Sequence, residues 1–138
     1  MGLSGGPKTG VAHAANVLVV DDEALAAEVI ARMLRQVGYS VVEAHNAREA
    51  LSALGAGDRR FDLVITDVVM PETDGRTLGQ MIGERYPGLP VLYVSAYPAN
   101  DVFHRGAPDS LVPFLQKPFS PEPLLIAVRR LITKPVRS

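Results

Sequence analysis

The sequence predicts one α/β domain built on a doubly wound, five-stranded parallel sheet. Three observations carry this prediction: the chain has 138 residues, 47% of them are hydrophobic, and short apolar runs alternate with segments of helical periodicity. The apolar runs show little alternation with polar residues, which is typical of strands buried on both faces. Helices are therefore expected to cover both faces of the sheet.

Five apolar runs rich in Val, Ile or Leu are the predicted strands. In chain order they are Val17–Val20, Ser40–Ala44, Leu63–Thr66, Val91–Ser95 and Val112–Leu115. Each is four or five residues long, the usual length of a short buried strand.

Helical periodicity between these runs predicts about five helices. The first covers Ala24–Val37 and ends before Gly38, a residue suited to a helix C-terminus. Its apolar positions form one predicted buried stripe: Val29, Ile30, Met33, Leu34 and Val37. Two more helices follow near Ala47–Leu54 and Gly75–Tyr86, and Asp74 is a predicted N-cap or turn residue before the second of these.

The last two helices are predicted to differ in length. In the stretch Asn100–Pro113, Gly106 and Pro108 interrupt the helical pattern, so the fourth helix should be short or irregular. The motif SPEP at Ser120–Pro123 supplies a capping Ser and a Pro suited to a first helical turn. The buried face of the helix that follows is predicted to contain Leu124, Leu125, Val128, Leu131 and Ile132.

Composition limits the domain organisation and the partners. We expect a flexible tail over residues 1–15, one domain over residues 16–133 and a short tail over residues 134–138. The formal net charge of -1 gives no electrostatic case for a nucleic-acid partner or an anionic membrane. There is no cysteine, and the sequence shows neither a signal peptide nor an apolar run long enough to span a membrane, so we expect a cytoplasmic protein.

Polar residues stand at the carboxyl ends of four predicted strands. Asp21 and Asp22 follow the first strand, Asp67 follows the third, Ser95 ends the fourth and Lys117 follows the fifth. The carboxyl ends of parallel strands meet at one edge of the sheet, where ligands usually bind. Three carboxylates, a hydroxyl and an ammonium at that edge predict a cation site with a nucleophile and a phosphoryl clamp.

Four ordered motifs, VLVVDDE, TDVVMPETDG, VLYVSAY and FLQKPF, resemble the receiver domain of two-component response regulators. The resemblance covers Asn16 to Ile132 and is strongest to receivers attached to hybrid histidine kinases. It implies a flavodoxin-like strand order of 2-1-3-4-5. It also implies that Asp67 accepts a phosphoryl group from a phosphohistidine of a histidine kinase or phosphotransfer protein. The implied cofactor is Mg²⁺, with Mn²⁺ as an alternative cation.

The resemblance assigns a role to each residue of the predicted site. It implies that Asp22 ligates the metal directly, that Asp21 acts through water, and that the backbone carbonyl of Val69 is a further ligand. Ser95 and Lys117 are expected to hold the phosphoryl oxygens.

The phosphoacceptor must be ionised in order to react. Repulsion from Asp21 and Asp22 should raise the pKa of Asp67, whereas the metal and the Lys117 ammonium should lower it. The resemblance also implies a cis peptide bond between Lys117 and Pro118, and cis bonds are far less costly before proline than elsewhere.

Two pairs of residues are expected to control signalling and the lifetime of the phosphoryl group. Phe114 is either a switch residue that changes position as Ser95 moves toward the phosphoryl group or simply a core residue. Val69 and Tyr97 are predicted rim residues that slow hydrolysis, because Val69 cannot orient a water and the Tyr97 ring shields the phosphorus. The alternative is that both only pack at the rim.

The favoured function is a phosphoacceptor module that signals through a conformational change to a downstream target that the sequence does not identify. We expect no enzymatic activity beyond its own phosphorylation and slow autodephosphorylation. The alternative is a phosphorylation-independent interaction module with the same fold. A phosphatase of the haloacid-dehalogenase type is disfavoured, because it needs an acid where Val69 stands. We expect a monomer, since the shortened fourth helix disturbs the family's usual dimer face.

Overall fold

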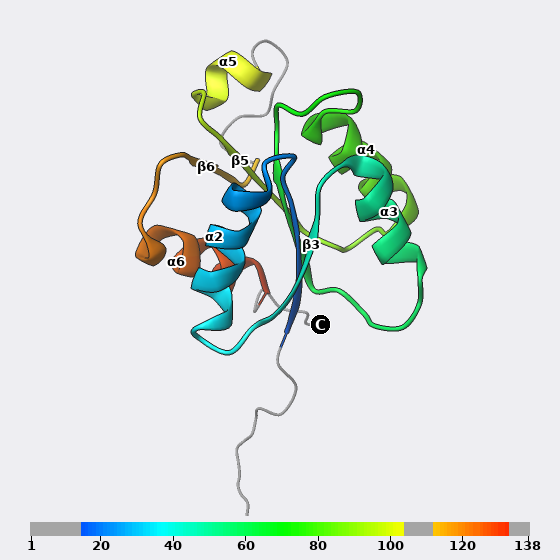
Figure 1. The fold of residues 1–138 in the computed structure, drawn as a ribbon. Helices are drawn as coiled ribbons and strands as arrows, with labels where there is room; N and C mark the ends of the chain where they lie inside the picture. Colours follow the sequence, from blue (N-terminus) through cyan, green and yellow to red (C-terminus); the bar gives the residue numbers. More distant parts are fainter. Residues whose placement is uncertain (1–14, 104–111, 133–138) are drawn as a thin grey trace, which may run out of the picture.

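The computed structural model describes residues 15–103 and 112–132 of the chain. In this part, five parallel strands form one sheet: β2 (Asn16–Val20), β3 (Ser40–Ala44), β4 (Leu63–Asp67), β5 (Val91–Ser95) and β6 (Phe114–Gln116). Their order in the sheet is β3-β2-β4-β5-β6, which confirms the expected order 2-1-3-4-5 (Figure 1). Apart from residue 15, the predicted tails lie outside the described residues.

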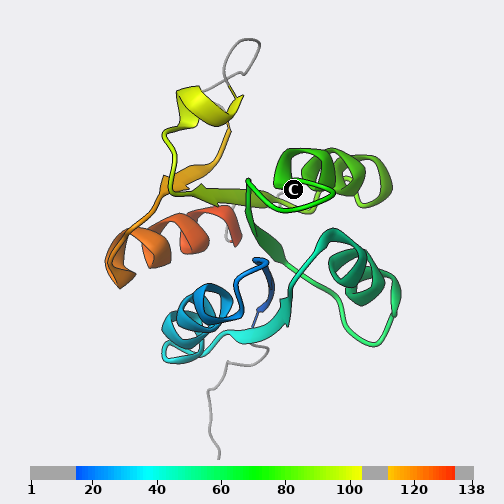
Figure 2. The same cartoon turned by 45° about the horizontal axis from the view of Figure 1, so that its top comes forward.

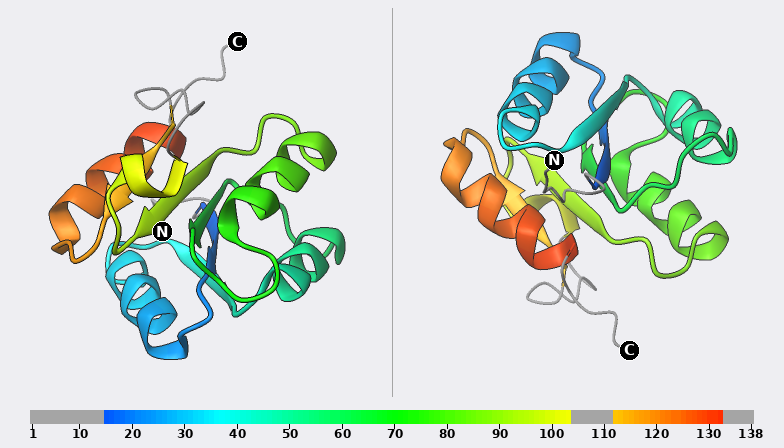
Figure 3. Two further views of the ribbon diagram at one scale, coloured as in Figure 1. Left: turned by 90° about the horizontal axis from the view of Figure 1, so that it is seen from above. Right: turned by 90° about the horizontal axis from the view of Figure 1, so that it is seen from below.

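Helices pack on both faces of this sheet. The described residues form α2 (Ala24–Arg35), α3 (Ala47–Gly55), α4 (Gly75–Arg85), α5 (Ala99–Phe103) and α6 (Pro121–Ile132). Helices α2 and α6 cover one face, and α3 and α4 cover the other, as the views from above and below show (Figure 3). This arrangement confirms the doubly wound α/β fold. None of the helices in the described ranges is long and apolar enough to cross a membrane.

Successive residues of β2 enter two different cores. Val17 and Val19 pack in the cluster under α2 and α6, whereas Leu18 and Val20 pack in the cluster under α3 and α4. All four are at most 1% exposed. The strand therefore needs apolar side chains at every position, which explains its unalternating sequence.

Helix α2 buries a different stripe from the one predicted. Val29 is 51% exposed and Val37 is 55% exposed, so assigning them to the core was wrong. The buried residues of α2 are Ala27, Ile30, Ala31 and Leu34. Small alanines let the helix approach the sheet closely, and this centres the buried face on them rather than on the larger valines.

The stop at Gly38 has the geometry of a Schellman motif. Gly38 has a φ of 102°, in the left-handed region that favours glycine. Its N–H donates to the Arg35 carbonyl at 3.0 Å, and the Tyr39 N–H donates to the Leu34 carbonyl at 3.2 Å. Helix α2 nevertheless ends at Arg35, two residues before the predicted end.

The last strand lies further along the chain than predicted. The sequence favoured Val112–Leu115, but β6 covers Phe114–Gln116. Pro113 has no N–H to donate to a sheet, so it precedes the strand and contributes only its carbonyl, which accepts from the Tyr93 N–H at 3.0 Å.

The predicted length of the fourth helix concerns residues that the structure describes only in part. Helix α5 covers Ala99–Phe103, where the first described range ends. The glycine and proline on which the prediction rested, Gly106 and Pro108, lie outside the described residues.

Helix α4 begins unusually close to the end of β4. The Gly75 N–H donates to the Val68 carbonyl at 2.7 Å. A Cβ at Gly75 would overlap the Asp67 carbonyl oxygen and lie 2.9 Å from the Val68 Cα. Only glycine therefore allows α4 to start at this point, beside the carboxyl edge that is tipped forward in Figure 2.

Candidate functional site

Three acids lie together at the carboxyl edge of the sheet. Asp21 and Asp22 follow β2, and Asp67 ends β4. Each offers a carboxylate oxygen, and these oxygens all lie within 4.8 Å of one another. The strands β2 and β4 are neighbours in the sheet, and this adjacency brings together acids more than forty residues apart in the chain.

Asp21 is the buried member of this acidic cluster, at 1% exposure. Its Oδ2 accepts from Lys117 Nζ at 2.9 Å, and its Oδ1 accepts from the Glu23 N–H at 3.0 Å. The Asp21 N–H donates to the Ala44 carbonyl at 3.0 Å. The two bonds to the carboxylate oxygens compensate the loss of hydration that a buried carboxylate suffers. Asp22, in contrast, is exposed and has access to water.

Asp67 lies between these acids and the ammonium of Lys117. Its side chain is 13% exposed, and Oδ1 is 3.9 Å from Lys117 Nζ. Burial raises the pKa of Asp67 to about 6, with further increases from Asp21 and Asp22, while Lys117 acts in the opposite direction. The sequence argument identified these charges. It missed burial, the largest cause, because burial depends on the assembled fold.

Ser95 and Lys117 are connected through the backbone of neighbouring strand ends. The Lys117 N–H donates to the Ser95 carbonyl at 2.7 Å. Ser95 is 1% exposed, and its Oγ accepts from the Tyr97 N–H at 3.1 Å. The Lys117–Pro118 bond is cis, as the resemblance implied. The structure thus brings both residues to the same edge as the acids.

The expected rim and switch residues differ in exposure. Val69, two residues after Asp67, is 52% exposed, and Tyr97, two residues after Ser95, is 55% exposed, so both side chains are open to solvent. Phe114 is partly buried on β6, in register with Tyr93 of β5.

Two residues near the site were not identified from the sequence. The buried Thr66 donates its hydroxyl to the Asp67 carbonyl at 2.9 Å. Gly75, described above, allows α4 to approach the same carbonyl. A polar residue inside an apolar strand and a glycine directly after an N-cap were the available signals.

The donor set fits a hard divalent cation. Carboxylate oxygens are the ligands that Mg²⁺ prefers, and Mg²⁺ usually keeps several waters while binding only a few protein groups. Asp22 and Asp67 offer such oxygens, and the exposure of Asp22 leaves room for water. The pairing of Asp21 with Lys117 keeps one carboxylate partly neutralised within the cluster.

The chain is similar to proteins of known family. The response regulator receiver domain family matches residues 17–129. The sensor kinase CckA of Brucella abortus is 38% identical over 127 residues, which cover 91% of this chain and 13% of that protein. The chain therefore spans only a small part of the length of this relative.

Solved structures show the same similarity. The receiver domain of the hybrid histidine kinase CckA matches with a TM-score of 0.70 and 33% identity, over 85% of this chain and 98% of that one. The response regulator protein TrrA of Thermotoga maritima, in complex with Mg(2+)-BeF, matches with a TM-score of 0.73 and 28% identity, over 85% and 98% of the two chains. The match to CckA agrees with the resemblance to receivers of hybrid kinases.

Proposed function

We propose that Asp67 accepts a phosphoryl group from a phosphohistidine. The premise of this proposal is that the chain belongs to the response regulator receiver domain family. The donor is a histidine kinase or a phosphotransfer protein of a two-component system. The observation that carries the proposal is the position of Asp67 at the end of β4, with two carboxylates nearby and Lys117 Nζ at 3.9 Å. A carboxylate in this setting is a nucleophile surrounded by groups that can hold a phosphoryl group.

In the proposed reaction, a carboxylate oxygen of Asp67 bonds to phosphorus as the bond between phosphorus and the donor imidazole breaks. Lys117 neutralises the charge on the phosphoryl oxygens, and its ion pair with Asp21 keeps the ammonium beside the reacting group. Asp22, Asp21, Asp67 and the Val69 carbonyl are the proposed holders of Mg²⁺. When bound, Mg²⁺ supplies positive charge that offsets the crowded carboxylates and the incoming phosphoryl oxygens.

The proposed signal is a movement of Ser95 toward the phosphoryl group. Its hydroxyl oxygen accepts from the Tyr97 N–H, and its O–H is the proposed donor to a phosphoryl oxygen. Phe114 is the proposed switch residue on the neighbouring strand. The proposed functional unit covers residues 16–133, and its downstream target lies outside the chain.

Acetyl phosphate with Mg²⁺ tests this function when the intact protein is weighed. We expect the mass of one phosphoryl group on the parent and none on Asp67→Asn. Asp58→Asn, which removes an exposed acid from the loop before β4, is the matched control and should be labelled like the parent. A parent that remains unlabelled would favour the alternative of a phosphorylation-independent interaction module. An Asp67→Asn protein labelled to the same extent would show that another residue is the phosphoacceptor.

A further inference from the structure

A row of residues in register crosses the sheet directly below the candidate site. Val20 pairs with Thr66, Thr66 with Tyr93, and Tyr93 with Phe114. Residues in register on neighbouring parallel strands point to the same face, and Val20 belongs to the core under α3 and α4. Tyr93 therefore lies on the α4 side of β5, beside Phe114 and two residues before Ser95.

The hydroxyl of Tyr93 lies against a glycine of α4. A Cβ at Gly79 would overlap the Tyr93 hydroxyl oxygen and lie 2.8 Å from its Cζ. Glycine is among the least favourable residues in a helix interior, so its use at Gly79 is explained by the space that the phenol occupies. Burial raises the pKa of Tyr93, and the charge of Asp74, the N-cap of α4, raises it further, which agrees with a phenol close to the start of this helix.

Helix α4 is thus in close contact with two different strands through its first half. Gly75 joins it to the end of β4, which carries Asp67, through the bond to the Val68 carbonyl. Gly79, four residues later, receives the side chain of Tyr93 from β5, which carries Ser95. One helix therefore touches both the phosphoacceptor strand and the strand of the proposed switch.

We propose that Tyr93 is a positioning residue that couples helix α4 to the movement of Ser95, so that phosphorylation of Asp67 changes the packing of α4. This inference rests on the proposed function. Because Tyr93 and Ser95 are two residues apart on one strand face, a shift at the end of β5 moves the ring that lies against Gly79. Tight packing transmits such a shift to α4, since the ring has no free space on the helix side.

Amide hydrogen exchange tests the coupling, with beryllium fluoride and Mg²⁺ as the phosphoryl stand-in. In the parent, we expect changed protection in residues 75–85 as well as around Asp67 and Ser95. In Tyr93→Leu, the changes around Asp67 and Ser95, including those at the Gly75 end of α4, should persist, and those in residues 79–85 should be lost. Tyr93→Phe removes the hydroxyl that lies against Gly79 but keeps the ring, so its response in α4 should lie between those of the parent and of Tyr93→Leu. Thermal melts establish that each variant is folded.

Two glycines of α4 form a matched pair for the same experiment. A Cβ at Gly83 meets nothing within 4 Å, whereas one at Gly79 overlaps Tyr93. Gly79→Ala should therefore alter exchange in α4 without any phosphoryl stand-in, and Gly83→Ala should not. Combining Gly79→Ala with Tyr93→Leu should restore the parent's exchange pattern without the stand-in, because the overlap is removed.

The outcomes separate this inference from the function on which it rests. If Tyr93→Leu keeps the full response of residues 79–85, or if the parent responds only around Asp67, Ser95 and the Gly75 end of α4, the coupling through Tyr93 is wrong and the proposed function stands. If acetyl phosphate leaves no phosphoryl group on Asp67, the proposed function fails and the inference fails with it.

Discussion

The two edges of the sheet carry charged residues in different ways. At the carboxyl edge, carboxylate oxygens of Asp21, Asp22 and Asp67 lie within 4.8 Å of one another, and Lys117 forms an ion pair with Asp21. At the amino edge, Asp62 accepts from the Asn16 N–H at 2.8 Å and joins two strand starts. The first arrangement costs stability because like charges are held together, whereas the second is an ordinary structural bond.

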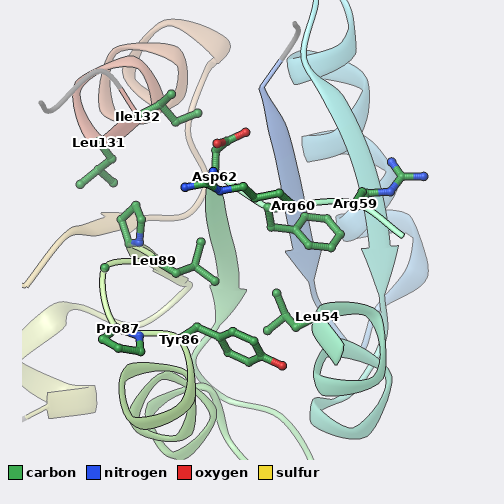
Figure 4. A pocket seen from close by; sticks show the side chains of 12 residues that line it. Leu54, Arg59, Arg60, Asp62, Tyr86, Pro87, Leu89, Leu131 and Ile132 are labelled. Atoms are coloured by element: carbon green, nitrogen blue, oxygen red, sulfur yellow. The ribbon is translucent and has the colours of Figure 1, made fainter. Parts of the chain in front are cut away.

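The amino edge has a cavity but no such crowding of acids among the residues that the structure describes. A pocket of about 860 Å³ is lined there by Leu54, Arg59, Arg60, Phe61, Asp62, Tyr86, Pro87, Gly88, Leu89, Pro90, Leu131 and Ile132. Figure 4 shows it between the ends of α3, α4 and α6, with the Arg59 side chain extending away from Leu131 and Ile132. The comparison teaches that concentrated charge, and not the volume of a cavity, identifies the candidate site of this protein.

The largest expected effect comes from removing the cation of the carboxyl edge. Lys117→Met leaves Asp21 buried without its partner, so we expect a loss of about 3 kcal/mol in the free energy of unfolding. Urea titration at neutral pH measures it. Arg32→Met is the control, because the Arg32–Glu28 pair is exposed on both sides and should contribute less than about 0.5 kcal/mol. Equal losses in the two variants would contradict the contrast between buried and exposed pairs.

The second effect concerns the charge of Asp67. Its pKa of about 6 in the folded protein lies above the ordinary 3.8. As the pH falls, the folded state therefore takes up the proton before the unfolded state does. Without metal, lowering the pH from 7.5 to 5 should therefore raise the stability of the parent relative to Asp67→Asn by about 1 kcal/mol. At pH 7.5 the variant should be more stable than the parent by about 2 kcal/mol.

Urea titrations in a chelator at both pH values measure this difference. Added Mg²⁺ should reduce the advantage of the variant, because the cation stabilises the charged parent. If the stabilities of parent and variant change in parallel across this pH range, the pKa of Asp67 is not raised by folding.

The third effect is kinetic and concerns the rim. Val69→Asn places a side chain able to orient water beside the phosphoryl group. We therefore expect hydrolysis of the phosphoryl group on Asp67 to become about threefold to tenfold faster. Val37→Asn is the matched control, since Val37 is 55% exposed, like Val69 at 52%, but follows a helix at the other edge. The decay of the phosphorylated mass measures both. A Val69→Asn protein no faster than the parent would mean that Val69 only packs at the rim.

The smallest effect is expected at the amino edge. Arg59→Ala removes an exposed cation of the pocket and should change stability by less than about 0.5 kcal/mol. Labelling by acetyl phosphate should proceed at the parent's rate to within about twofold, because the pocket lies at the opposite edge. A tenfold change in rate would break the comparison and show that the two edges communicate.

Local patterns predicted much of this structure correctly. The run Val17–Val20 was assigned as a strand because every position is apolar, and the structure shows why. Asp74 was expected as a cap, and it accepts from the Thr77 N–H at 2.9 Å. Such features depend on a few consecutive residues and on the parallel arrangement that the pattern implies.

Predictions failed where the answer depended on distant contacts. The exposure of Val29 depends on how α2 lies on the sheet, which the helical period alone does not define. The start of β6, in contrast, was missed for a local reason, because Pro113 has no N–H to donate to a sheet.

The sequence by itself determined the fold class, the strand order through a family resemblance, and the acids, hydroxyl and lysine of the candidate site. Each was readable because strand ends carry those residues in order along the chain. Only the tertiary structure decided that Asp21 pairs with Lys117, 96 residues away, and that burial raises the pKa of Asp67. It also decided that Gly79 makes room for Tyr93. Pairing, burial and close packing involve residues far apart in the chain, and only the folded chain brings such residues into contact.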